Sequence, residues 1–264
     1  MNKKSMVVAG IAFFTISSSA FADQSDEGYR HDRTGATYRV EFHNLTDAQW
    51  FSPILCVLHN RRLIMFKDGQ AATTGQATFS EDGFNGILAA ELRENPLVYS
   101  VLQSEPGLTP PDSYRVEHIT GPKRARLTCA AMPVTTNDVL TVVHNVKTPK
   151  HTGDTKNYYS TEWDLGSEEN NYSAESMPED SLNLVAESAD NPVTISDNVV
   201  FGATGRPIGV PSLLSPFTRA FFNGNVIAEG TMSVFTHYEG SEAFPTQLYG
   251  WNDSASRLSV TRID

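Results

Sequence analysis

The stretch that decides the fold is Tyr38-Arg39-Val40-Glu41-Phe42-His43. Large apolar side chains alternate here with charged or polar ones, and this period of two is typical of a β-strand with one buried face. The run Asn44-Leu45-Thr46-Asp47 follows and supplies residues that favour a turn. Residues 51–58 then form a nearly continuous apolar run. Such a run predicts a second strand that is buried on both faces.

The rest of the chain repeats these signals at short intervals. We expect further strands at 97–102, 114–119, 125–131, 139–146, 158–163, 231–238 and 258–263. Residues 67–95 differ, because small residues and helix formers predominate there, so we expect a long crossover with one or two short helices near 70–95, packed across an edge of the sheets. Many short strands without regularly alternating long helices predict an all-β domain, a sandwich or a barrel.

The first residues have the pattern of a cleaved export signal. Lys3 and Lys4 precede an apolar run from Met6 to Ile16, and small residues lead to Ala20-Phe21-Ala22. This pattern predicts a signal peptide at 1–22. The apolar run is shorter than the roughly 20 residues that a membrane-spanning helix needs, although a retained anchor is the alternative. We therefore expect an exported protein, periplasmic or secreted, with no transmembrane segment after cleavage.

The charge of the chain excludes one class of partner. Its formal net charge is −11, and removal of residues 1–22 takes away Lys3 and Lys4 and no acid, which leaves −13. Binding to a phosphate backbone requires a surplus of Lys and Arg, so we expect no nucleic-acid partner. After a flexible lead-in at 23–36, we expect one domain at 37–264 and no second domain.

Cys56 and Cys129 are the only two cysteines of the chain. In an oxidising compartment an even pair is a candidate disulfide. The alternative is two buried free thiols, because the sequence does not show whether the two Cα atoms approach each other.

Two acidic turns are the strongest candidates for chemistry. The turn 132–138 carries Asn137 and Asp138, and the turn 164–170 carries Asp164 and Glu168. If the strands 125–131, 139–146 and 158–163 form an antiparallel meander, both turns lie at the same end of it. Clustered carboxylate and amide oxygens are typical calcium ligands. The alternative is that they are solvated turn residues, which Asn and Asp often are.

Familiar catalytic motifs are missing from the sequence. There is no G-x-S-x-G, H-E-x-x-H, P-loop or G-x-G-x-x-G motif. The seven histidines are scattered, and His59 and His144 fall at strand ends, where capping or solvated roles are common. A catalytic group assembled from distant residues stays open as an alternative, because such groups are defined by geometry.

The motifs taken in order resemble those of the spondin domain, in particular of bacterial exported spondin-domain proteins. The resemblance covers about residues 37–263. It is carried by Tyr38–Thr46, Phe51–Pro53, Leu58–Asn60, Gly69–Ala71, Ala77, Ser80–Gly83, Met132–Asp138, Trp163–Asn170, Gly250–Asp253 and Arg257–Thr261.

This resemblance implies an antiparallel β-sandwich of about eight strands with a calcium ion at one end. In animals the family forms extracellular matrix and cell-adhesion modules. Its calcium ligands correspond here to Asp138 or its neighbour Asn137, to Asp164 and to Glu168. The chain departs from the family at Val139, where animal members have an aromatic residue, in Leu165-Gly166-Ser167, and in a longer, acidic segment at 171–228 that we interpret as an insertion.

Three functions are consistent with these features. We favour a calcium-binding adhesion or interaction module, not an enzyme, whose partner is an extracellular or cell-envelope protein or a glycan. The alternatives are an exported metal-assisted hydrolase that uses the same carboxylates, and a structural envelope protein without a discrete ligand.

Overall fold

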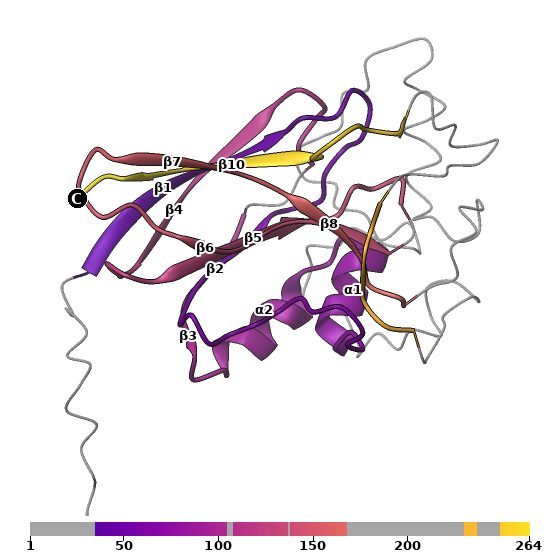
Figure 1. Cartoon of the computed structure of the whole chain (residues 1–264), viewed down its shortest axis with the longest axis horizontal. Coiled ribbons are helices and arrows are strands. Elements are labelled where there is room, and N and C mark those ends of the chain that lie inside the picture. Colours follow the sequence, from indigo (N-terminus) through magenta and orange to yellow (C-terminus); the bar gives the residue numbers. More distant parts are fainter. Residues whose placement is uncertain (1–34, 105–107, 137, 168–229, 237–248) are drawn as a thin grey trace, which may run out of the picture. The chain divides into compact units, whose positions relative to one another are not determined.

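The computed structural model describes residues 35–104, 108–136, 138–167, 230–236 and 249–264. Their regular structure consists mainly of strands, which form two antiparallel sheets, and this confirms the predicted all-β sandwich (Figure 1). The predicted signal peptide at 1–22 and the insertion at 171–228 lie outside the described residues. The predicted lead-in ends too late, because Gly35 and Ala36 already belong to the first strand.

The smaller sheet has four strands in the order β4-β1-β10-β7. Its members are β1 (Gly35–Asn44), β4 (Tyr114–Pro122), β7 (Thr155–Tyr159) and β10 (Ser256–Arg262). Every second side chain of β1, from Ala36 to Asn44, is buried, so the predicted alternation is confirmed. The other face of this sheet carries the half-exposed and exposed side chains.

The larger sheet has six strands in the order β3-β2-β5-β6-β8-β9. These are β2 (Leu55–His59), β3 (Val98–Gln103), β5 (Arg126–Ala131), β6 (Val139–Lys147), β8 (Thr161–Asp164) and β9 (Ser233–Val234). All five residues of β2 are buried, as its continuous apolar run predicts. The strand begins at Leu55 and not at Phe51, since Pro53 has no N–H to donate to a neighbouring strand.

Two apolar cores lie on opposite faces of the larger sheet. One fills the space between the sheets, and its largest members are Tyr38, Phe42, Phe51, Ile54, Leu58 and Leu127. The other lies between the larger sheet and the helices, and includes Leu55, Val57, Phe79, Leu88, Leu92, Leu140 and Val142. Successive residues of β2 therefore enter different cores, because side chains alternate across a strand.

The crossover contains two helices, α1 (Thr74–Asp82) and α2 (Gly86–Arg93). Thr73 and Gln76 form a reciprocal capping box at the start of α1, and Gly83 ends it in the left-handed conformation. The helices cover the outer face of the larger sheet, so their predicted position across an edge is wrong (Figure 1). Of the helices that the structure describes, none is long and apolar enough to cross a membrane.

The segment predicted as one strand at 158–163 is two strands in two different sheets. Strand β7 pairs with β10, and β8 pairs with β6, so the chain changes sheets at Ser160. Next to this point the buried Glu162 accepts hydrogen bonds through Oε1 from Ser160 Oγ, Thr141 Oγ1 and the Ala255 N–H. Burial raises the pKa of the Glu162 carboxyl, although these hydrogen bonds act in the opposite direction. This carboxyl joins the two sheets.

Cys56 and Cys129 form a disulfide, which confirms the predicted pairing. They are direct register partners on β2 and β5, with Cα atoms 4.1 Å apart. Both are fully buried in the core between the sheets. The bridge spans 73 residues of sequence and encloses both helices, β3 and β4.

Loss of this bridge should lower the free energy of unfolding by about 4 kcal/mol, because the cross-link restricts the unfolded chain. The measurement is urea unfolding of the oxidised protein and of a Cys56→Ala/Cys129→Ala variant. A reductant should lower the stability of the parent protein and leave the variant unchanged. Equal midpoints for the oxidised and reduced parent would contradict the expectation.

Candidate functional site

The two acidic turns meet where β6 begins and β8 ends. Val139 and Asp164 are register partners, and the Leu165 N–H donates to the Asp138 backbone oxygen at 3.0 Å. The predicted convergence of the turns is therefore confirmed for the residues that the structure describes. In the β5-β6-β8 order, each strand is antiparallel to its neighbour. The turn that follows β5 and the turn that follows β8 therefore lie at the same end of the sheet.

The side chain of Asp138 holds the second turn in place. Its Oδ2 atom accepts the Ser167 N–H at 2.7 Å and lies 3.4 Å from Ser167 Oγ. Both residues are fully buried. A hydrogen bond to a charged group contributes about 1.5 to 3 kcal/mol, so this contact is a strong local constraint.

Asp164 shapes its own turn. Its Oδ1 atom accepts the Gly166 N–H at 2.7 Å, which is the geometry of an Asx turn. Gly166 has a φ of +63°, and a Cβ atom built there would lie 2.6 Å from the backbone N and O of Thr231. A glycine is therefore required both by the backbone conformation and by the close approach of the segment that leads into β9.

A buried polar network connects the turn at 132–138 to distant parts of the chain. Gln49 Oε1 accepts hydrogen bonds from the Thr135 N–H and Oγ1, while Gln49 Nε2 donates to the Tyr249 carbonyl. Asn44, at the end of β1, donates to the Gln49 carbonyl. The sequence indicates Asn44 only as a turn residue, and no local pattern marks Gln49, because its partners lie 86 and 200 positions away.

Two more carboxylates lie close to the first turn. Glu81 and Asp82, at the end of α1, are each 1% exposed. The adjoining Gly83 faces Ser52. Ser52 and Met132 donate hydrogen bonds to each other, so α1 ends beside the start of the turn at 132–138. The structure places Ser80, Glu81 and Asp82 in the last turn of α1, with Gly83 as the C-terminal cap. Burial of both acids was not predicted, because it depends on where α1 packs.

The oxygen donors at this end suit a hard cation, but the described part alone does not form a complete set of ligands. Among the described residues, no group of three or more His, Cys, Asp or Glu side chains is arranged to hold a metal ion. Of the predicted ligands, Asn137 and Glu168 lie outside the described residues. Asp138 directly follows Asn137, and Asp164 precedes Glu168 by four positions. Both aspartates offer carboxylate oxygen atoms, which are ligands that calcium prefers.

His59 and His144 are not solvated capping residues, so that interpretation is wrong. His59 is fully buried, with Nε2 2.9 Å from Thr128 Oγ1 and Nδ1 2.8 Å from the Asn60 carbonyl. His144 lies against the ring of Phe66 and accepts the Met65 N–H. Burial, with His59 nearby, lowers the pKa of His144 to about 4. Both histidines are on the helix side of the larger sheet, away from the acidic turns.

Comparisons with known proteins found no match, either among protein-family models or among curated proteins. The resemblance to the spondin domain therefore stays a prediction that is carried by the ordered motifs.

Gly166→Ala should destabilise the domain by roughly 2 kcal/mol or more, because the methyl group adds a backbone clash to the cost of a left-handed residue. Gly153→Ala is the matched control. Gly153 also has a positive φ, of +85°, but nothing lies within 4 Å of an added Cβ. Its cost should stay at about 1 kcal/mol. Equal losses in thermal or urea unfolding would contradict the close approach of Thr231.

His144→Gln should flatten the pH dependence of stability between pH 6.5 and 4. The unfolded chain binds a proton at this histidine near pH 6.5, whereas the folded chain binds it only near pH 4. Stability of the parent protein is therefore lost as the pH falls through this window. The loss from this half-buried ring should be roughly 1 to 3 kcal/mol.

The measurement is urea unfolding at several pH values. The His151→Gln variant, on an exposed turn, controls for removal of a histidine outside the core. Parallel stability curves for the parent and His144→Gln proteins would contradict the prediction.

Proposed function

We propose that the chain is an exported, calcium-stabilised interaction module of the spondin type, which binds an extracellular or cell-envelope partner. The observation that carries this proposal is the direct joining of the two acidic turns through Asp138, Asp164 and Ser167 at one end of the sandwich. A site formed by two loop tips at the end of a rigid scaffold is a common arrangement for binding residues.

Export is supported by the disulfide and by the first residues of the chain. Disulfides persist in oxidising compartments and are rare in the cytosol. The Cys56–Cys129 bridge is buried in the central core. Together with the signal pattern at 1–22, it favours a protein that folds outside the cytoplasm.

Calcium is supported by the charge around the turns. Residues 157–205 contain ten Asp or Glu and no Lys or Arg, so no basic side chain of this stretch offsets its acids. Like charges that are held together by folding repel one another, and a divalent cation removes this repulsion. Asp138 and Asp164 would bind the ion with Asn137 and Glu168, and the ion would supply a rigid link between the turns.

The contacts of the carboxylates favour an interaction module over a hydrolase. Asp138 and Asp164 each accept a hydrogen bond from the backbone of the second turn. An ion bound to these groups would therefore fix the shape of the loop surface. A hydrolase would instead need one of them within hydrogen-bond reach of a reacting group.

Calcium should raise the melting temperature of the domain. A ligand that binds only the folded state stabilises it by about 2.7 kcal/mol at a hundredfold excess over its dissociation constant. The measurement is thermal unfolding of the chain in millimolar calcium and in excess chelator. Magnesium at the same concentration should have a smaller effect, because it requires a stricter octahedral geometry. An unchanged melting curve would contradict a calcium site.

Asp138→Asn and Asp164→Asn should each reduce the calcium-induced shift, whatever their effect on stability without calcium. Asp154→Asn is the matched control, because Asp154 also accepts a turn N–H, from His151, but lies beyond the opposite end of β6. A shift of equal size in all three variants would place the ion elsewhere.

A further inference from the structure

The open face of the four-stranded sheet carries a row of side chains that crosses all four strands. Tyr114 on β4 is the register partner of His43 on β1, His43 of Arg257 on β10, and Arg257 of Tyr159 on β7. Direct partners in neighbouring strands point to the same face of a sheet. Tyr114, His43, Arg257 and Tyr159 are therefore neighbours, although more than 200 positions separate His43 from Arg257 in the sequence.

The two ends of the row are exposed aromatic rings. Tyr114 is 55% exposed and Tyr159 is 64% exposed, on the two edge strands of the sheet. The Tyr114 ring stacks on His43 with centroids 4.9 Å apart, so one of its faces is held by the protein. Three strand spacings of about 4.8 Å separate the tyrosines, which gives a platform roughly 14 Å wide.

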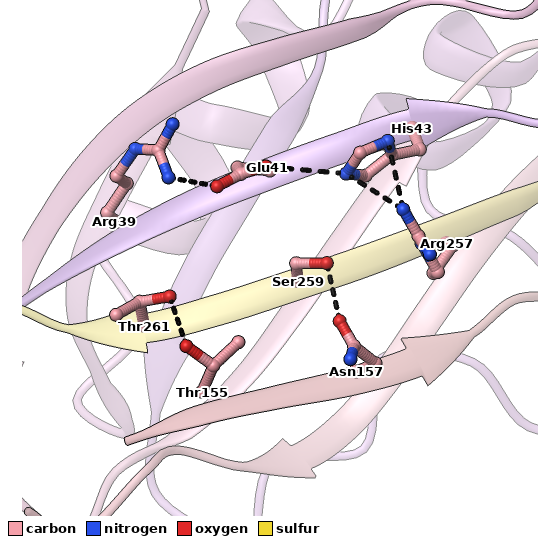
Figure 2. A network of polar contacts seen from close by, with 8 residues as sticks. All are labelled: Arg39, Glu41, His43, Thr155, Asn157, Arg257, Ser259 and Thr261. Atoms are coloured by element: carbon pink, nitrogen blue, oxygen red, sulfur yellow. Dashed lines mark hydrogen bonds and ion pairs between the residues drawn. The ribbon is translucent and has the colours of Figure 1, made fainter. Parts of the chain in front are cut away.

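The centre of the row carries a positive charge without an acidic partner. On β1, Arg39 pairs with Glu41, which also approaches His43 at 3.5 Å (Figure 2). Arg257 Nη2 instead lies 3.3 Å from both ring nitrogens of His43. Among the described residues no carboxylate pairs with Arg257, and its Nε atom has no hydrogen-bond acceptor. Burial and the nearby Arg257 lower the pKa of His43, which keeps this ring neutral beside the guanidinium.

A strip of fixed polar groups continues from the row. Figure 2 shows Ser259 and Thr261 of β10 directed at Asn157 and Thr155 of β7. Ser259 Oγ donates to Asn157 Oδ1, and the hydroxyls of Thr155 and Thr261 lie 2.8 Å apart. The exposed Thr155 and Asn157 offer donors and acceptors to a ligand at little cost in side-chain entropy, because Thr261 and the buried Ser259 already fix their positions.

We propose that this face binds an acidic glycan, with sugar rings on Tyr114 and Tyr159 and an anionic group, a carboxylate or a sulfate ester, on Arg257. The apolar C–H faces of a pyranose ring pack against an aromatic ring, while its hydroxyls need donors and acceptors of the kind that Thr155 and Asn157 provide. A guanidinium matches a carboxylate or sulfate group through paired N–H donors.

The charges on this face favour an anionic ligand. The register places Arg39, Glu41 and Arg257 on it, whereas the whole chain has a net charge of −11. On this face Arg39 is paired with Glu41, so an anionic group is attracted to Arg257, and this attraction orients the polymer on the row. The inference is independent of the proposed calcium site, because the row is built from strands of the other sheet.

The test is isothermal titration of the chain, in calcium and in chelator at a temperature where it is folded, with three oligosaccharides of similar length. One carries uronic acids, one carries sulfate esters, and one is neutral. The parent protein should bind one or both acidic oligomers at least tenfold more tightly than the neutral one, and more weakly at high salt. A preference between the acidic oligomers identifies the anionic group.

Arg257→Gln should weaken binding of the acidic oligomer roughly tenfold or more, and Tyr159→Ala roughly threefold to tenfold. The matched controls are Arg93→Gln on α2 and Tyr99→Ala on β3, which remove the same residue types from the other sheet and its helices. Thermal unfolding checks that each variant folds, and Tyr159→Ala tests the platform even if Arg257→Gln does not fold.

Several results would overturn the inference. They are no binding of either acidic oligomer, equal binding of the neutral oligomer, or equal losses in the test and control variants. Binding that persists in chelator would support a glycan site on this sheet, even if calcium has no effect on the melting temperature. Binding that disappears in chelator while the domain remains folded would contradict a site on the strands and place the glycan at the acidic turns.

Discussion

Burial of the central strands of the larger sheet on both faces is the constraint on which the rest of the structure depends. In β2 the odd and even side chains enter different cores, so each face needs its own cover. The four-stranded sheet covers one face, and α1 and α2 cover the other. The Cys56–Cys129 bridge lies within this doubly covered layer. It ties β2 to β5, and hence the crossover helices to the strands that carry the acidic turns.

The change of sheets at Ser160 positions both proposed binding regions. Because the chain leaves the four-stranded sheet after Tyr159, this residue is the exposed end of the row that begins at Tyr114. Because β8 then joins β6, Asp164 comes to lie opposite Val139 and beside Asp138. The buried Glu162 holds this corner through Ser160, Thr141 and Ala255. A carboxyl with three hydrogen bonds in a buried place gives the corner a defined geometry, which an apolar contact would not.

The two proposed sites differ in their electrostatics and therefore in what they can bind. The acidic turns bring the buried carboxylates of Asp138 and Asp164 to one end of the larger sheet, where a small hard cation would balance their charge. The row through His43 and Arg257 has a surplus of positive charge on a flat sheet, where an extended anionic chain would lie across the strands. A module with both features could be stabilised by an ion at one place and attached to a polymer at another.

The sequence by itself determined the strand pattern and the meeting of the acidic turns. The alternation at 38–43 and the continuous apolar run before His59 are local signals. The end of a meander at which each turn lies depends only on the order of the strands. The even number of cysteines also indicated the disulfide that the structure contains. Only the tertiary structure decided the split at Ser160, the place of the helices on a face, the burial of His59 and His144, and the row from Tyr114 to Tyr159. These features depend on strand register and on packing between residues far apart in the chain, which no local pattern encodes.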